Sequence, residues 1–199
     1  MTAVAAALVG SYWIDYLYRR PNAPLSFPDS LNGTHTFRKI FLTVIFFFSS
    51  IYCAKMPPLD FIFHVTAAFF LAVIVVTDCE QYIIFDMVLL PFALLGILFT
   101  LLSETSFLER LSAAFCGGAF FFALLILTKN GIGGGDVKLV ASLGFWLGAE
   151  GLLSTVLTAS ILGGVCALFM ILTGFKKRKD FFAYGPYFCI AAAWQLFIP

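Results

Sequence analysis

The sequence has very few charged residues. Only 12% of its 199 residues are charged, whereas 61% are hydrophobic and 18% are aromatic. Soluble domains usually contain about 25% charged residues, so this scarcity excludes an ordinary soluble domain. The formal net charge of +1 also argues against the basic face or stripe that a nucleic-acid-binding protein needs. We therefore expect a membrane protein, with the lipid bilayer as its partner and no bound nucleic acid.

Closely spaced metal ligands are also missing. The five cysteines are odd in number and widely separated, and no Cys-x-x-Cys motif occurs. The two histidines, His35 and His64, have no partners at the spacing of a metal site. We therefore expect neither a disulfide framework nor a metal centre.

Long apolar runs, in contrast, recur along the whole chain. A helix needs about 20 mostly apolar residues to cross a bilayer. The eight candidate runs are residues 2–18, 40–54, 58–77, 87–103, 107–128, 137–149, 151–173 and 182–198. The breaks between them are too short to hold a separate domain. The sequence therefore predicts an all-α fold, a polytopic membrane helix bundle of about eight transmembrane helices that forms a single domain over residues 1–199.

Basic residues gather on one side of this predicted bundle. Arg19 and Arg20 follow the first run and no basic residue precedes it, the reverse of a secretory signal. We therefore expect a retained first helix with its N-terminus outside. If the helices alternate in direction, ten Lys and Arg residues lie in or beside the loops of one side and two lie on the other. This bias assigns the loops 19–39, 78–86, 129–136 and 174–181 to the cytoplasm, including a basic anchor at 176–179 and a short cytoplasmic loop at 19–39.

Two of these cytoplasmic loops carry acidic residues at the membrane edge. The stretch GIGGGDVK places Asp136 after a run of glycines, and VTDCEQYIIFD contains Asp78, Glu80 and Asp86. Asp78 directly follows an apolar run that ends at Thr77. Because a carboxylate in or beside hydrocarbon is costly, such an acid marks a candidate functional site.

The glycine run indicates an unusual backbone next to Asp136. Four glycines occupy the five positions before this residue, among them Gly133, Gly134 and Gly135. Glycines permit positive φ and the close approach of another chain. The following run, 137–149, would be only about 20 Å long against the roughly 30 Å of a bilayer core. Either the glycine loop dips below the lipid surface or the helix extends back through it, and a wet cavity lined by Asp136 follows as a hypothesis.

Two carboxylates in one cavity can carry out aspartyl proteolysis. The ionised acid takes a proton from the attacking water, and the protonated acid polarises the peptide carbonyl. Asp136 would stand at a helix start, where the dipole favours an anion, and Asp78 at a helix end. We predict Asp136 as the anion and Asp78 as the proton holder, an assignment that Glu80 and Lys138 could reverse. The alternative is a proton-coupled transporter or proton pathway that uses these carboxylates as a relay.

The same motifs resemble those of the type IV prepilin leader peptidases, the GxGD class of membrane aspartyl proteases. The segment GIGGGDVKLVASLGFWLG is similar to the family's glycine and aspartate motif, with Lys138 two places after Asp136. Asp78 opens and Asp86 closes the family's other aspartate pattern, with Phe85 where proline is usual. GSYWIDYLYRRP at 10–21 and YGPYFCIAAA at 184–193 resemble its first and last helices.

This resemblance implies an endopeptidase that removes a short basic leader from prepilins or pseudopilins. Cleavage would take place at the cytoplasmic face of the inner membrane and would need no cofactor. The implied catalytic residues are Asp78 and Asp136. Residues of the substrate loop, or residues surrounding the pair, would be Gly133, Gly134, Gly135, Lys138, Glu80 and Asp86.

The chain departs from many members of that family in its first loop. Those members carry a larger segment there with paired CxxC motifs that bind zinc, and they also methylate the new N-terminus with S-adenosylmethionine. Here the loop has about 21 residues and no cysteine. Zinc is therefore not expected, and S-adenosylmethionine is a cofactor only if the methyltransferase activity is retained. The sequence makes no prediction about self-association.

Overall fold

The structure, a computed structural model, describes residues 2–20, 25–27, 35–103, 105–128, 132–175 and 182–198. All regular secondary structure in these ranges is helical. The helices are α1 (Thr2–Tyr18), α2 (Thr36–Cys53), α3 (Pro58–Gln81), α4 (Asp86–Leu102), α5 (Phe107–Leu127), α6 (Gly134–Leu172) and α7 (Gly185–Phe197). The predicted all-α fold is confirmed. The basic run at 176–179 and most of the loop 19–39 lie outside the described residues.

The helices have the length and composition of membrane spans. α2, α3, α5 and α6 are long and apolar enough to cross a bilayer, and α4 is a shorter apolar helix. Large apolar side chains cover their outer faces, and Phe115 on α5 is 75% exposed. Exposed apolar surface of this extent is typical of contact with a membrane. The chain is thus a polytopic helical bundle, whereas about eight spans and an outside N-terminus stay predictions.

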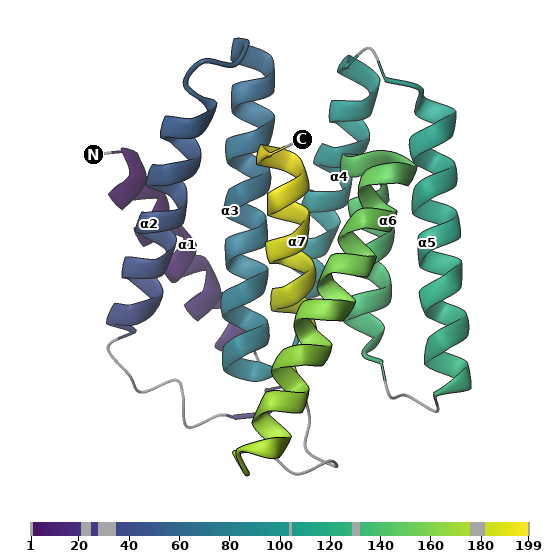
Figure 1. Cartoon of the computed structure of the whole chain (residues 1–199). Coiled ribbons are helices and arrows are strands. Elements are labelled where there is room, and N and C mark those ends of the chain that lie inside the picture. Colours follow the sequence, from purple (N-terminus) through teal and green to yellow (C-terminus); the bar gives the residue numbers. More distant parts are fainter. Residues whose placement is uncertain are drawn as a thin grey trace.

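α7 joins two groups of helices (Figure 1). α3 packs against α2 and α7, and α6 packs against α5, α4 and α7. Figure 1 shows α7 between α3 and α6, with its N-terminal end beside the end of α3 and the start of α6. The candidate acids therefore come from helices on either side of α7.

α6 consists of two helical segments that meet at Gly148. This residue has φ 70° and ψ −173°, a conformation that essentially only glycine adopts. Figure 1 shows the helix turning back at this point. The break lies two residues before the gap between the predicted runs 137–149 and 151–173.

The backbone groups freed by this break find partners at the start of α5. The N–H of Ala149 donates to the Glu109 carboxylate, and Arg110 donates to the carbonyl oxygens of Phe145 and Trp146. Buried backbone groups at membrane depth must be satisfied within the protein. The two charges also suit the helix dipoles. The Glu109 carboxylate lies at the start of the second segment of α6, and the Arg110 guanidinium lies at the end of the first segment. The reversal of α6 is therefore stabilised by a neighbouring pair of side chains.

Candidate active site

Asp78 lies in the last turn of α3 and is 5% exposed. The sequence had placed Asp78 and Glu80 in a loop after a helix ending at residue 77, and this boundary was wrong. α3 continues to Gln81, and Tyr82, with a left-handed φ of 54°, ends it by donating its N–H to the Asp78 carbonyl oxygen at 2.9 Å. Because the helix extends past Asp78, this carboxyl group is held by a regular helix rather than by a loop.

Asp136 lies in the first turn of α6. The helix begins at Gly134, so it extends back through part of the glycine run, as one of the two predicted alternatives required. The N–H of Gly133 donates to Asp136 Oδ2 at 3.3 Å. Among the described glycines, only Gly148 and Gly174 have positive φ. Gly133, Gly134 and Gly135 therefore do not adopt the positive φ that glycine permits.

Gly135 and Gly185 allow neighbouring segments to pack closely around Ile84. A Cβ atom on Gly135, the neighbour of Asp136, would lie 3.0 Å from Ile84 Cβ. A Cβ atom on Gly185 would lie 2.6 Å from Asp78 Oδ2 and 3.2 Å from Ile84 Cδ1. The absence of side chains at these two positions lets the start of α6, the start of α7 and the loop 82–85 meet at one point. Asp136, the residue after Gly135, is close enough to Asp78 for its charge to act on the Asp78 carboxyl group.

The Asp78 carboxyl group has an unusual environment. Its Oδ2 atom is buried and has no hydrogen-bond partner among the described residues. The backbone N–H of Gly185 at the start of α7 interacts with the same carboxyl group. Burial without full hydrogen bonding disfavours the charged form, whereas the N-terminal end of α7 favours it. The sequence placed Asp78 at the end of one helix and gave no sign that the start of α7 lies beside it.

A salt bridge joins the start of α6 to the start of α4. Lys138 Nζ lies 2.7 Å from Asp86 Oδ1 and 2.8 Å from Asp86 Oδ2. Lys138 belongs to the beginning of α6, and Asp86 is the first residue of α4. Both side chains are more than half exposed. The structure therefore pairs two of the predicted residues with each other.

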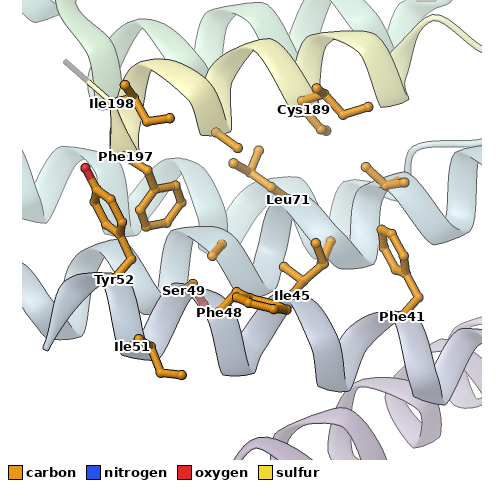
Figure 2. Close-up of a pocket in the computed structure, with 15 residues that line it drawn as sticks. Phe41, Ile45, Phe48, Ser49, Ile51, Tyr52, Leu71, Cys189, Phe197 and Ile198 are labelled. Carbon is orange, nitrogen blue, oxygen red and sulfur yellow. The ribbon is translucent and has the colours of Figure 1, made fainter.

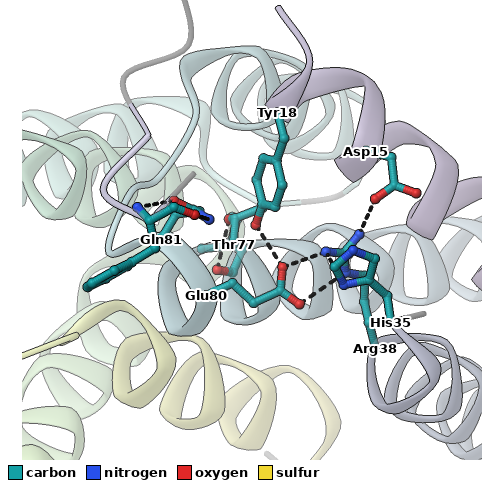
Figure 3. Close-up of polar contacts among 9 residues, drawn as sticks. Asp15, Tyr18, His35, Arg38, Thr77, Glu80 and Gln81 are labelled. Carbon is teal, nitrogen blue, oxygen red and sulfur yellow. Dashed lines mark hydrogen bonds and ion pairs between the residues drawn. The ribbon is translucent and has the colours of Figure 1, made fainter. Parts of the chain in front are cut away.

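Glu80 belongs to a partly buried polar cluster (Figure 3). Arg38, which is 1% exposed, donates to Asp15 Oδ1 at 2.6 Å and to Glu80 Oε2 at 2.6 Å. The Tyr18 hydroxyl donates to Glu80 Oε2 at 3.0 Å. Arg38 was expected in a cytoplasmic loop, and this was wrong, because it lies in α2 and ties α1 to α3. Asp15, an acid inside an apolar run, was the signal in the sequence that such a partner existed.

Gln81 holds residues 25–27 of the loop between α1 and α2. Its side-chain amide accepts a hydrogen bond from the Phe27 N–H at 2.9 Å and donates to the Phe27 carbonyl oxygen at 3.0 Å. Figure 3 shows Gln81 beside the cluster around Glu80. The residue is fully buried. The segment 25–27 is thereby fixed one helical turn from Asp78.

Comparison with known proteins adds an independent observation. The model of the type IV leader peptidase family matches residues 65–168, a range that includes both Asp78 and Asp136. The prepilin leader peptidase/N-methyltransferase of Aeromonas hydrophila is 32% identical over 120 residues, which are 57% of this chain and 41% of that protein. The protein of the same name from Neisseria gonorrhoeae is 32% identical over 136 residues, covering 64% of this chain and 45% of that protein.

A third relative of the same name, from Pseudomonas aeruginosa, is 29% identical over 120 residues, again 57% of this chain and 41% of that protein. The chain thus matches less than half the length of these curated relatives. No solved structure matches it.

Proposed function

Because the chain belongs to the type IV leader peptidase family, we propose that it is a membrane aspartyl endopeptidase that removes the leader from prepilins or pseudopilins. The observation that supports this proposal is the packing of Gly135, the neighbour of Asp136, and of Gly185, the neighbour of the Asp78 carboxyl group, on the same residue, Ile84. Asp78 and Asp136 come from two separate helices, α3 and α6, and the charge of Asp136 acts on Asp78. The proposal includes the inner membrane as the location and its cytoplasmic face as the side of cleavage, which the basic residues of the sequence support.

The chemistry follows from two acids that share one proton. The ionised carboxylate takes a proton from water as the water oxygen attacks the carbonyl carbon of the peptide. The protonated partner gives its proton to the carbonyl oxygen. The tetrahedral intermediate then collapses, the C–N bond breaks, and a proton passes to the leaving nitrogen. Like charges at short range do not ionise together easily, so the pair titrates as a unit.

We assign the shared proton to Asp78 and the negative charge to Asp136. Asp78 is 5% exposed and its Oδ2 atom lacks a partner, which favours the neutral acid. Asp136 is less buried and accepts a hydrogen bond from Gly133 at the start of α6. A helix start favours an anion.

Methylation of the new N-terminus forms no part of this mechanism. The relatives' names include N-methyltransferase, an activity for which we infer no site here. The large pocket formed by described residues is lined only by uncharged side chains, which do not match the sulfonium and carboxylate groups of S-adenosylmethionine. Labelled S-adenosylmethionine added to a cleavage reaction would reveal the activity as label on the mature product.

The test of the peptidase is cleavage of a prepilin by the purified protein in detergent or lipid. Asp78→Asn and Asp136→Asn should each abolish leader removal while leaving the melting temperature close to that of the wild type. Asp60→Asn is the matched control, because Asp60 lies in the first turn of the same helix as Asp78, at the opposite end. An aspartate variant that cleaves at the wild-type rate would show that the catalytic pair is misassigned.

A further inference from the structure

An apolar groove runs between α2 and α7 (Figure 2). Its volume is about 420 Å³. Residues of α3, among them Ala68 and Ala72, form its floor, and α2 and α7 form its two walls. None of the fifteen lining residues is charged. The groove therefore offers an uncharged channel along the side of the bundle.

The groove opens toward the lipid. Both α2 and α3 are long and apolar enough to cross a membrane. Phe48 on one wall is 64% exposed, and Ile190 on the other wall is 55% exposed. A molecule can therefore enter the groove sideways from within the bilayer.

One end of the groove lies near the two acids. Val75 and Cys189 line it, and they lie one helical turn from Asp78 and from Gly185, respectively. The Cys189 thiol is close enough for the charges of both Asp78 and Asp136 to act on it. The groove therefore ends about one helical turn from the candidate active site.

We propose that this groove receives the apolar helix of the prepilin, so that the peptide bond preceding that helix is presented to Asp78 and Asp136. This inference rests on the proposed peptidase function. The wall of α7 extends from Cys189 to Ile198, about 14 Å at 1.5 Å per residue. A substrate helix that starts near Asp78 and Asp136 and follows the groove would contact uncharged walls over between two and three helical turns.

The physical properties of the groove select a helix as its occupant. Charged side chains on this path would be buried in apolar surroundings at high cost, so the occupant must be apolar. Inside lipid, only a helix satisfies its own backbone hydrogen bonds. The small residues Ala68, Ala72 and Ala193 permit close helix approach. The arrangement is the membrane counterpart of a helix that lays its apolar face into a groove.

Photo-cross-linking tests the occupant directly. A photoreactive phenylalanine analogue at Phe48, placed in the Asp136→Asn variant to keep the substrate uncut, should cross-link to the prepilin helix. Phe47 is the matched control, because it is the adjacent residue, is 51% exposed and does not line the groove. Cross-links to lipid alone at Phe48, or equal cross-links to prepilin from both positions, would overturn the proposal.

A second test separates the groove from the catalytic site. Ala193→Phe narrows the groove and should lower kcat/KM for full-length prepilin about tenfold, while cleavage of a soluble peptide that carries the leader junction without the helix stays unchanged. Ala119→Phe on the exposed face of α5 is the control and should change neither reaction. Equal loss on both substrates, or no loss on prepilin, would refute the groove. A wild-type protein that cleaves neither substrate would instead refute the peptidase function itself.

Discussion

Arg38 holds the carboxylate of Glu80 through two hydrogen bonds, from Nε to Oε1 at 3.0 Å and from Nη2 to Oε2 at 2.6 Å. A planar guanidinium makes such a two-point contact with a carboxylate, and the ammonium group of lysine does not. Asp15 binds the same arginine through Nη1 at 2.6 Å. The last turn of α3, which carries Asp78, is thus fixed to α1 and α2.

Removing this arginine should destabilise the bundle strongly. Arg38→Met leaves two acids without their cation. Breaking a fully buried ion pair in this way costs about 3–5 kcal/mol, and the cost here should lie at or below the lower end of that range because Asp15 and Glu80 are 37% and 26% exposed. We expect a clear fall in the melting temperature in detergent. Arg20→Met, which removes an exposed arginine, is the control and should have little effect. The double variant Arg38→Met with Glu80→Gln should recover part of the loss, and a single variant as stable as the control would contradict the role of the cluster.

Adjacent glycines should respond differently to substitution. Gly135→Ala forces a methyl group to within 3.0 Å of Ile84 Cβ and displaces the start of α6 from the loop 82–85. A displacement of about 1 Å in a catalytic group costs on the order of 10²-fold in rate. A Cβ atom on Gly134 meets no atom within 4 Å, so Gly134→Ala should keep most of the activity. Initial cleavage rates at equal protein concentration test this prediction, which fails if both variants behave alike.

The salt bridge between Lys138 and Asp86 should matter more for cleavage than for stability. Exposed ion pairs contribute about 0–1 kcal/mol, so Lys138→Asp should lower the melting temperature only slightly. It should reduce the cleavage rate, because two negative charges would then repel each other and push the start of α6 away from the start of α4. The exchanged pair, Lys138→Asp with Asp86→Lys, should cleave faster than either single reversal. A double variant no better than the worse single one would show that the pair does not position the site.

Replacing Gly148 should be costly for a backbone reason. At φ 70° and ψ −173° any other residue is strained by about 1–3 kcal/mol, and the added Cβ atom would also lie 2.8 Å from Glu109 Oε1. Gly148→Ala should therefore lower the melting temperature. Gly164 is the comparison, because its Cβ would meet nothing within 4 Å, and Gly164→Ala should be neutral or stabilising by up to about 1 kcal/mol. Similar effects of the two variants would refute the strained break.

The sequence predicted the parts of this structure that local patterns encode. Apolar runs located the helices, and the cost of an acid beside lipid singled out Asp78 and Asp136 before their surroundings were known. Contacts between distant segments left no such pattern. The pairing of Arg38 with Glu80 and the wedge of Ile84 between Gly135 and Gly185 depend on how helices pack, which hydrophobic periodicity does not report. The end of α3 was missed because its last turn is polar.

The position of α7 has a consequence for biosynthesis. This helix packs against both α3 and α6, and its first residue touches the Asp78 carboxyl group. The ribosome makes α3 and α6 before α7. A nascent chain therefore contains both Asp78 and Asp136 before α7 is available to pack against their helices. The proposed catalytic pair would therefore be assembled only after α7 has entered the membrane.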